Sequence, residues 1–127
     1  MGKTKIDSNP FSILRSRLEG VKLLIRDMEE TDAENLMDSI VNADRVFITG
    51  KGRSGLIAEC CAVRMMQMGV DVHVPGEATC PRIRKGDLMI AIPCSGNTMT
   101  TVQLAKISKS AGAEVIAITA MSDSRLA

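Results

Sequence analysis

The first third of the chain carries two apolar patterns with helical spacing. Between residues 11 and 30, apolar residues recur at steps of three and four and would form one stripe along a helix: Leu14, Leu18, Val21, Leu24, Ile25 and Met28. Thr31 is a suitable N-cap for a second helix, and the acidic Asp32 and Glu34 favour its first turn. The buried side of that helix would consist of Leu36, Met37, Ile40 and Val41. The pattern therefore predicts an N-terminal helical hairpin within residues 1–43.

From Arg45 onward, short β-branched runs alternate with segments of helical length. The runs predict four strands, over Val46–Thr49, Val70–Val74, Leu88–Ile92 and Val115–Thr119. Two helices are expected between them, over Leu56–Met68 and Thr98–Ala111, and each is followed by a glycine suited to a helix end, Gly69 or Gly112. Strands joined by helical crossovers run parallel, and their near-continuous apolar character indicates cover on both faces. Residues 75–86 lack helical periodicity and are expected to be a loop. We therefore expect residues 44–127 to form a three-layer, doubly wound parallel α/β core.

The composition narrows the class of protein. The 127 residues, 45% of them apolar, suffice for a single domain over residues 1–127 and are too few for two ordinary ones. The 16 basic and 15 acidic residues nearly cancel, and only Phe11 and Phe47 are aromatic, so the chain lacks the basic field and stacking platform typical of nucleic-acid binding. No apolar run approaches the roughly 20 residues of a membrane helix, and no signal-peptide core is present, so we expect a cytoplasmic protein without a membrane partner.

The cysteines and the end of the chain give two further expectations. Four cysteines without a CxxC pair and a single histidine offer no metal-ligand spacing, so we expect reduced thiols and no metal site. Near the last residue, Ser122 or Ser124 is suited to cap another helix that begins at Leu126. Four parallel strands without that helix would leave one face of the sheet thinly covered. The domain is therefore expected to be truncated at its C-terminus or completed by assembly.

A glycine-rich turn follows the first predicted strand. In Gly50-Lys51-Gly52-Arg53-Ser54-Gly55, three glycines permit a sharp turn and a close approach of the backbone to a ligand. Ser54 stands just before the helix expected near Leu56, where it would either cap that helix or donate to a phosphate oxygen. The GxGxxG spacing also occurs in dinucleotide-binding sites. The acidic residue that such sites carry about 20 positions later is replaced here by Val72-His73-Val74-Pro75, which argues against a dinucleotide.

A second turn, Ile92-Pro93-Cys94-Ser95-Gly96-Asn97-Thr98, follows the third predicted strand. Its backbone N–H groups, the hydroxyls of Ser95 and Thr98 and the positive end of the next helix would converge on a point that suits a phosphate. A plain helix cap would also account for this turn taken alone. Because the carboxyl ends of neighbouring parallel strands share one edge of a sheet, the two turns together predict one ligand crevice. The lysine of a nucleoside triphosphate loop is absent, which favours a small phosphorylated metabolite.

These residues together resemble sugar isomerase (SIS) domains. The resemblance rests on the two turns, on Gly76-Glu77, on Lys85-Gly86-Asp87 and on the stretch from Ile118 to Ala127, and it covers essentially the whole chain. Within the SIS domains, the chain is most similar to the 6-phospho-3-hexuloisomerases. The resemblance implies a flavodoxin-like strand order and conversion of 3-hexulose 6-phosphate to fructose 6-phosphate through an enediol. It also implies no metal or nucleotide cofactor and a homo-oligomer, either a tetramer or a dimer.

The resemblance further implies the residues of the site. The family's contacts with phosphate and sugar fall on Ser54, Cys94, Ser95, Gly96, Asn97 and Thr98. Gly52 and Arg53 stand beside Ser54 in the first turn, and Arg53 is a candidate for contact with a sugar hydroxyl. Pro93 departs from the family, which commonly has a small or hydroxyl residue there, and the proline removes one N–H group from the turn.

The base that the reaction needs is not assigned by the sequence. The family carries its general-base glutamate on a helix beyond the last family segment present here. His73, the only histidine, and Glu77 are the local candidates, although a single strand histidine is more often packed and a loop carboxylate more often exposed. Glu59 is expected to be solvated.

The sequence is therefore compatible with three functions. The first is a sugar-phosphate isomerase. The second is a non-catalytic phosphosugar-binding module, either regulatory or truncated, which the lack of an assigned base favours. The third, a flavodoxin-like or dinucleotide-binding domain, would need a bound cofactor and has little support in a chain with so few aromatic residues.

Overall fold

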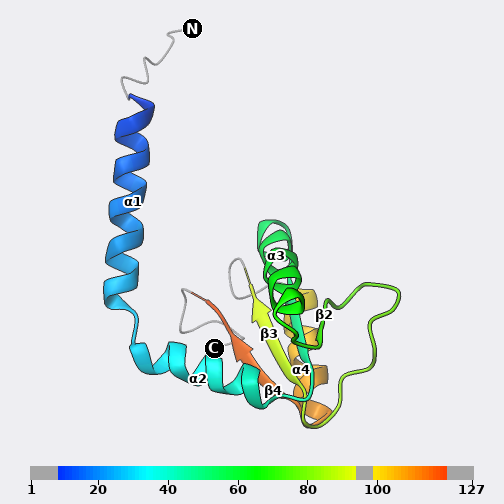
Figure 1. The fold of residues 1–127 in the computed structure, drawn as a ribbon. Coiled ribbons are helices and arrows are strands. Elements are labelled where there is room, and N and C mark those ends of the chain that lie inside the picture. Colours follow the sequence, from blue (N-terminus) through cyan, green and yellow to red (C-terminus); the bar gives the residue numbers. More distant parts are fainter. Residues whose placement is uncertain (1–8, 94–98, 120–127) are drawn as a thin grey trace, which may run out of the picture. The chain divides into compact units, whose positions relative to one another are not determined.

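The computed structural model describes residues 9–93 and 99–119, and the chain clusters into two compact units, Met1–Asn35 and Leu36–Ala127. The first unit contains helix α1, Pro10–Asp27, and the beginning of helix α2, Glu30–Asn42 (Figure 1). α1 begins where its sequence favours a start. Asn9 Oδ1 accepts a hydrogen bond from Phe11 N at 3.0 Å, and Pro10 fills the first helical position, where a missing N–H costs nothing. None of the residues of α1 is buried within the described part of the chain.

α2 begins two residues earlier than the sequence suggested, at Glu30 instead of Asp32. Asp32 N donates a hydrogen bond to Glu29 O at 3.1 Å, so the first turn closes around Thr31. The prediction that Thr31 is the N-cap is therefore wrong, because Thr31 already lies inside the helix. The pairing of α1 and α2 as a hairpin stays a prediction.

The second unit is built on a sheet of four parallel strands (Figure 1). The strands are β1, Val46–Gly50; β2, Val72–His73; β3, Leu88–Ile92; and β4, Glu114–Ala117. Their order, β2-β1-β3-β4, is the flavodoxin-like order that the resemblance implied, and the parallel α/β prediction is confirmed. β2 is shorter than predicted because Val70 N donates to Met65 O at 3.0 Å, which closes the end of the preceding helix and keeps Val70 out of the sheet.

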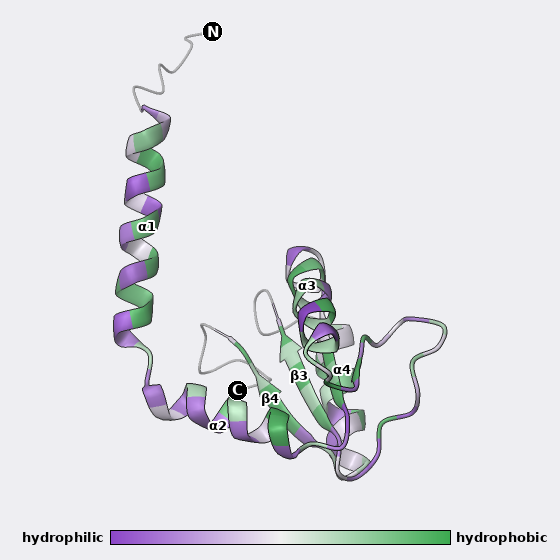
Figure 2. Ribbon diagram, in the orientation of Figure 1, coloured by the Kyte–Doolittle hydropathy of each residue, from purple (hydrophilic) through white to green (hydrophobic). Residues whose placement is uncertain are grey.

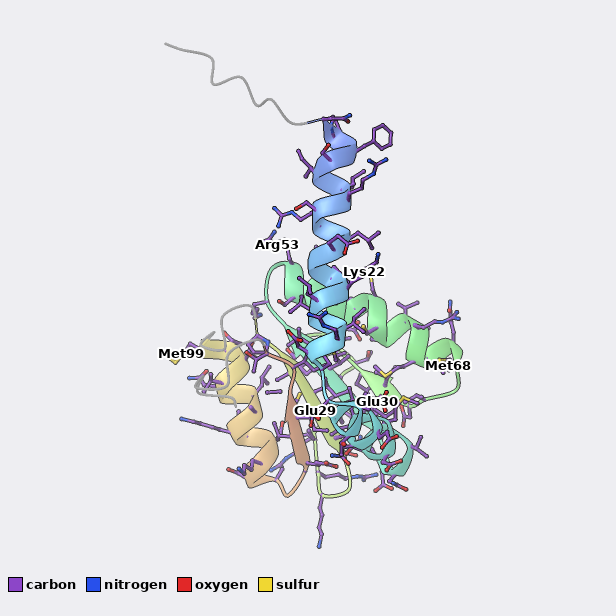
Figure 3. All side chains as sticks on the ribbon, turned by 90° about the vertical axis from the view of Figure 1, so that its left-hand side faces the viewer. Lys22, Glu29, Glu30, Arg53, Met68 and Met99 are labelled. Carbon is purple, nitrogen blue, oxygen red and sulfur yellow. The ribbon has the colours of Figure 1, made fainter. Side chains whose placement is uncertain are left out.

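Helices α3, Arg53–Gln67, and α4, Met99–Ser110, lie on opposite sides of this sheet (Figure 3). Alternate strand residues point to opposite faces, so one face carries Val46, Ile48, Leu88 and Ile90, which pack with Ala58 and Ala62 of α3. The other face carries the buried residues Phe47, Met89 and Ala91, next to the buried residues Val102 and Ala105 of α4. Figure 2 shows the hydrophobic character of β3 and β4 that this double cover requires.

A buried ion pair fixes the amino ends of the strands. Arg45 Nη2 lies 2.6 Å from Asp87 Oδ2, and the Asp87 side chain is fully buried. The same carboxylate accepts a hydrogen bond from Arg84 N at 2.8 Å, and Arg45 Nη2 also donates to Arg82 O at 3.0 Å. Burial acts to raise the pKa of Asp87, but the hydrogen bonds from Arg45 and Arg84 outweigh it and the pKa is lowered. The pair therefore ties the end of the long connection from β2 to β3 to the sheet.

Candidate functional site

The junction between β1 and α3 depends on close backbone packing. A Cβ atom at Gly50 would lie 2.7 Å from the carbonyl carbon and oxygen of Ser54, and one at Gly55 would lie 3.0 Å from Gly50 O. Both positions therefore require glycine. Between them Gly52 adopts a φ of +59°, a conformation that residues with side chains rarely adopt. The chain consequently reverses within a few residues and starts α3 directly against the end of β1.

This junction corrects one prediction for Ser54. α3 begins at Arg53 with Gly52 as its N-cap, and no side chain caps it. Ser54 is the second residue of the helix, so the interpretation of Ser54 as the cap is wrong. The physical reason is that the left-handed Gly52 starts the helix three residues earlier than the apolar periodicity suggested. The first-turn N–H groups of α3, which carry partial positive charge, are left without a capping oxygen from a side chain.

A hollow of about 300 Å³ opens at the carboxyl edge of the sheet. This is the edge at which open parallel sheets bind their ligands. Its walls come from the end of β1 with the residue that follows it, from α3, from the segment after β2 and from the first turns of α4. The lining residues are Thr49, Gly50, Lys51, Gly55, Ala58, Glu59, Val74, Pro75, Gly76, Thr100 and Leu104. We call this cavity the carboxyl-edge hollow.

The residues predicted for the site fall in two groups. The first group lies at the start of α3, beside the hollow but not among its lining residues: Gly52 is the N-cap, and Arg53 and Ser54 are the first two residues of the helix (Figure 3). Ser54 is half-buried. The second predicted group, Cys94, Ser95, Gly96, Asn97 and Thr98, lies outside the described residues. The strands that precede the two turns are neighbours, because Gly50 pairs with Ile92 at the ends of β1 and β3.

The two candidate bases do not line the hollow. His73 Nε2 lies 2.9 Å from Asp71 Oδ1, and its ring packs on Phe47 with the ring centroids 5.3 Å apart. Glu77 is exposed, and its carbonyl oxygen accepts a hydrogen bond from Cys80 N. The contacts of His73 are those of a packed strand residue, and a role for either residue in proton transfer stays a prediction.

The sequence interpretation missed Lys51, Glu59 and Thr100 as lining residues. Lys51 directly follows Gly50, the last residue of β1, and lines the hollow. Glu59 is exposed, as expected, but it stands four residues after Gly55 on the same side of α3. That spacing was the available signal, because Gly55 faces the end of β1. A lysine, a glutamate and a threonine are thus among the residues that line the hollow.

Beside the hollow, the first turn of α4 contains an unpaired hydroxyl. Thr101 is fully buried. Among the buried side-chain nitrogen and oxygen atoms of the described residues, its Oγ1 is the one without a hydrogen-bond partner. A buried hydroxyl without a partner costs about 1–3 kcal/mol. This unpaired hydroxyl lies at the same edge of the sheet as the uncapped start of α3.

The family model for the SIS domain matches residues 39–127, which include the whole sheet, both covering helices and the carboxyl-edge hollow. The chain belongs to the SIS domain family. A 3-hexulose-6-phosphate isomerase from Mycobacterium gastri is 45% identical over 92 residues, which cover 72% of this chain and 46% of that protein. A 3-hexulose-6-phosphate isomerase from Methanocaldococcus jannaschii is 38% identical over 113 residues, which cover 89% of this chain and 59% of that protein.

A solved structure agrees with these relatives. It is that of a hypothetical protein from Methanococcus jannaschii for which a function as 3-hexulose-6-phosphate isomerase has been inferred; the TM-score is 0.74 at 36% identity, with 82% of this chain and 59% of that chain covered. The chain spans about half the length of the curated relatives it matches. Within the described part of this SIS domain, no helix has the length and apolar character needed to cross a membrane.

Proposed function

We propose that this SIS domain serves a sugar-phosphate isomerase that interconverts 3-hexulose 6-phosphate and fructose 6-phosphate through an enediol. The observation that carries the proposal is the 45% identity to the Mycobacterium gastri 3-hexulose-6-phosphate isomerase. The carboxyl-edge hollow adds physical support, because it joins an uncapped helix start to polar and charged side chains. We propose further that the protein is cytoplasmic and works as a homo-oligomer, a dimer or a tetramer.

The phosphate of the sugar is proposed to bind between the starts of α3 and α4. The hydroxyl of Ser54 and the first-turn N–H groups of α3 would donate to its oxygens, with Gly52 keeping the backbone accessible. Cys94, Ser95, Gly96, Asn97 and Thr98 would supply the second half of the cradle. Lys51 adds a positive charge at the hollow, and Arg53 is proposed to contact a sugar hydroxyl.

The sugar itself would extend into the carboxyl-edge hollow, where Glu59 and Thr100 can form hydrogen bonds with its hydroxyl groups. A base takes the proton from C2 of the 3-ketose and the C3 carbonyl oxygen gains a proton, giving an enediol across C2 and C3. The C2 hydroxyl then loses its proton as C3 is protonated, which gives the 2-ketose. Donors near the developing enediolate oxygen would stabilise that intermediate. The base remains unassigned, because neither His73 nor Glu77 lines the hollow.

A non-catalytic phosphosugar-binding module is the second candidate. It is favoured by one observation, that neither of the candidate bases His73 and Glu77 lines the carboxyl-edge hollow. Both functions use the same binding site, so affinity for the sugar phosphate does not separate them. Turnover does.

The decisive experiment is a coupled assay with the complete gene product and 3-hexulose 6-phosphate. The isomerase proposal expects fructose 6-phosphate to form at a rate proportional to enzyme concentration. If no product forms at high enzyme concentration while fructose 6-phosphate binds normally, the isomerase proposal is rejected and the non-catalytic binding module is supported.

Binding is tested on the 127-residue chain by thermal denaturation. Fructose 6-phosphate at about 100 times its dissociation constant should stabilise the fold by about 2.7 kcal/mol, whereas unphosphorylated fructose should not. Lys51→Met and Ser54→Ala should each reduce this effect, and Lys22→Met on α1 serves as the matched surface control. An unchanged effect in both site variants would contradict the proposed phosphate position.

A further inference from the structure

A second cavity lies at the opposite, amino edge of the sheet. Its volume is about 340 Å³, and it opens between the loop before β3 and the last turns of α4; it is lined by Arg82, Ile83, Lys106, Ile107, Ser110 and Ala111. We call it the distal slot. It shares no lining residue with the carboxyl-edge hollow and has no part in the function proposed above.

The loop wall of the distal slot is fixed in place. Arg82 O accepts a hydrogen bond from Arg45 Nη2 at 3.0 Å, and Arg45 is itself held by the buried carboxylate of Asp87 at 2.6 Å. Arg84 N, two residues after Arg82, donates to the same carboxylate at 2.8 Å. A wall ordered before binding spares a ligand the entropic cost of ordering it.

The lining of the distal slot is mainly apolar and includes two cationic residues, Arg82 and Lys106. Ile83, Ile107 and Ala111 provide the apolar part, and Ile107 is 60% exposed although it is a large aliphatic residue. Arg82 and Lys106 are exposed, and the ion pairs found within residues 9–93 and 99–119 include neither of them. Their charges are therefore free to pair with an anion, and the hydroxyl of Ser110 can donate beside them.

We propose that the distal slot binds a small molecule that carries one oxyanion, a phosphate or a carboxylate, on a short apolar body. The volume lies within the range of small-molecule sites, and the two free cations select against a neutral apolar ligand. The slot also lies beside the C-terminal end of α4, whose carbonyl groups carry partial negative charge. An anion there needs both cations to offset that charge, so loss of either one should weaken binding.

The test uses octyl phosphate and octanoate as probes of the two oxyanions, with octanol and inorganic phosphate as the controls that lack one part. Titrations are followed by NMR of the isoleucine methyl groups of the 127-residue chain. Octyl phosphate or octanoate should shift the Ile83 and Ile107 signals, and each control should bind at least about tenfold more weakly. The stronger of the two probes identifies the oxyanion.

Charge variants locate the site. Arg82→Gln and Lys106→Met should each weaken binding of the better probe about tenfold, the loss expected for one charge-assisted hydrogen bond. Lys109→Met, which removes an exposed lysine of the same helix outside the slot, should leave the affinity unchanged. Both slot positions are on the surface, and circular dichroism confirms that the variants fold.

Three results would overturn the proposal. The first is the absence of shifts at Ile83 and Ile107 with either probe. The second is binding of inorganic phosphate or octanol as tightly as the better probe, which would show that the slot does not require both an oxyanion and an apolar body. The third is displacement of the probe by fructose 6-phosphate, which would place it in the carboxyl-edge hollow. Failure of the sugar-phosphate proposal would appear separately, as loss of fructose 6-phosphate binding with the isoleucine shifts intact.

Discussion

The polar groups just before β1 and β3 are paired with one another, whereas several of those at the carboxyl ends of the strands are not. At the amino edge, the charges of Arg45 and Asp87 are matched, buried and hydrogen-bonded. At the carboxyl edge, α3 starts without a side-chain cap, Lys51 and Glu59 face a hollow, and Thr101 has a buried hydroxyl without a partner. Pairing of this kind stabilises a fold, whereas unpaired groups are available to a ligand. The paired Arg45 and Asp87 therefore sustain stability, whereas the unpaired groups of the carboxyl-edge hollow, like the free cations of the distal slot, are suited to binding.

The largest effect should come from breaking the pair at the amino edge. Arg45→Met leaves the Asp87 carboxylate buried without its cation and should lower the free energy of unfolding by about 3–5 kcal/mol. Urea denaturation measures this loss. Arg84→Gln, which keeps the backbone donor to Asp87, is the control and should change stability by about 0.5 kcal/mol or less. Similar losses in the two variants would contradict the role given to the pair.

Gly50→Ala should have the next largest effect, and it acts on the carboxyl edge. The added methyl group would meet the backbone of Ser54 at 2.7 Å and force β1 and α3 apart, at a cost of about 1–3 kcal/mol. Fructose 6-phosphate should also bind more weakly. Gly20→Ala is the matched control, because nothing lies within 4 Å of its Cβ and alanine favours the α1 helix by up to about 1 kcal/mol. Equal stability of the two variants would show that the junction tolerates separation.

The dependence of stability on acid pH should be a smaller effect, and it tests the Arg45–Asp87 pair separately. The pKa of Asp87 is lowered in the folded state, so the unfolded state binds a proton more readily and stability rises with pH. This contribution is complete above the ordinary aspartate pKa of about 3.9 and is lost as the pH falls through the lower folded value. Thermal melts between neutral and acid pH should show this loss in the parent chain. In Arg45→Met this loss should be smaller, because only Arg84 is left to oppose the effect of burial on the pKa of Asp87.

The smallest effect is expected at Thr101. Thr101→Val removes a hydroxyl that is desolvated without a partner and should raise the free energy of unfolding by up to about 1 kcal/mol. Ser108→Ala, in the same helix, removes a hydroxyl that donates to Leu104 O at 2.7 Å and should lower it by up to about 1 kcal/mol. The opposite signs, measured by urea denaturation, test whether the two hydroxyls differ as described. A destabilised Thr101→Val would show that this hydroxyl has a partner in solution.

The sequence predicted most of the core and less of the site, for physical reasons. The apolar runs of β1 and β3 specify strands covered on both faces, so the parallel architecture follows from local pattern. Helix starts were predicted less well: Thr31 was interpreted as a cap, and Ser54 either as a cap or as a donor to a phosphate oxygen. A hydroxyl residue before an apolar stripe has the composition of a cap wherever the helix begins. Gly52 decides the start of α3 through its backbone conformation, which periodicity does not reveal. Lys51, Glu59 and Thr100 meet only through tertiary packing.

The brevity of β2 protects the molecule from self-association through its main chain. β2 stands at one border of the described sheet and contributes only two residues, Val72 and His73. A strand from a neighbouring molecule would find too few free amide and carbonyl groups there to extend the ladder. Raising the protein concentration should therefore not cause molecules to pair edge to edge through β2 into a continuous sheet.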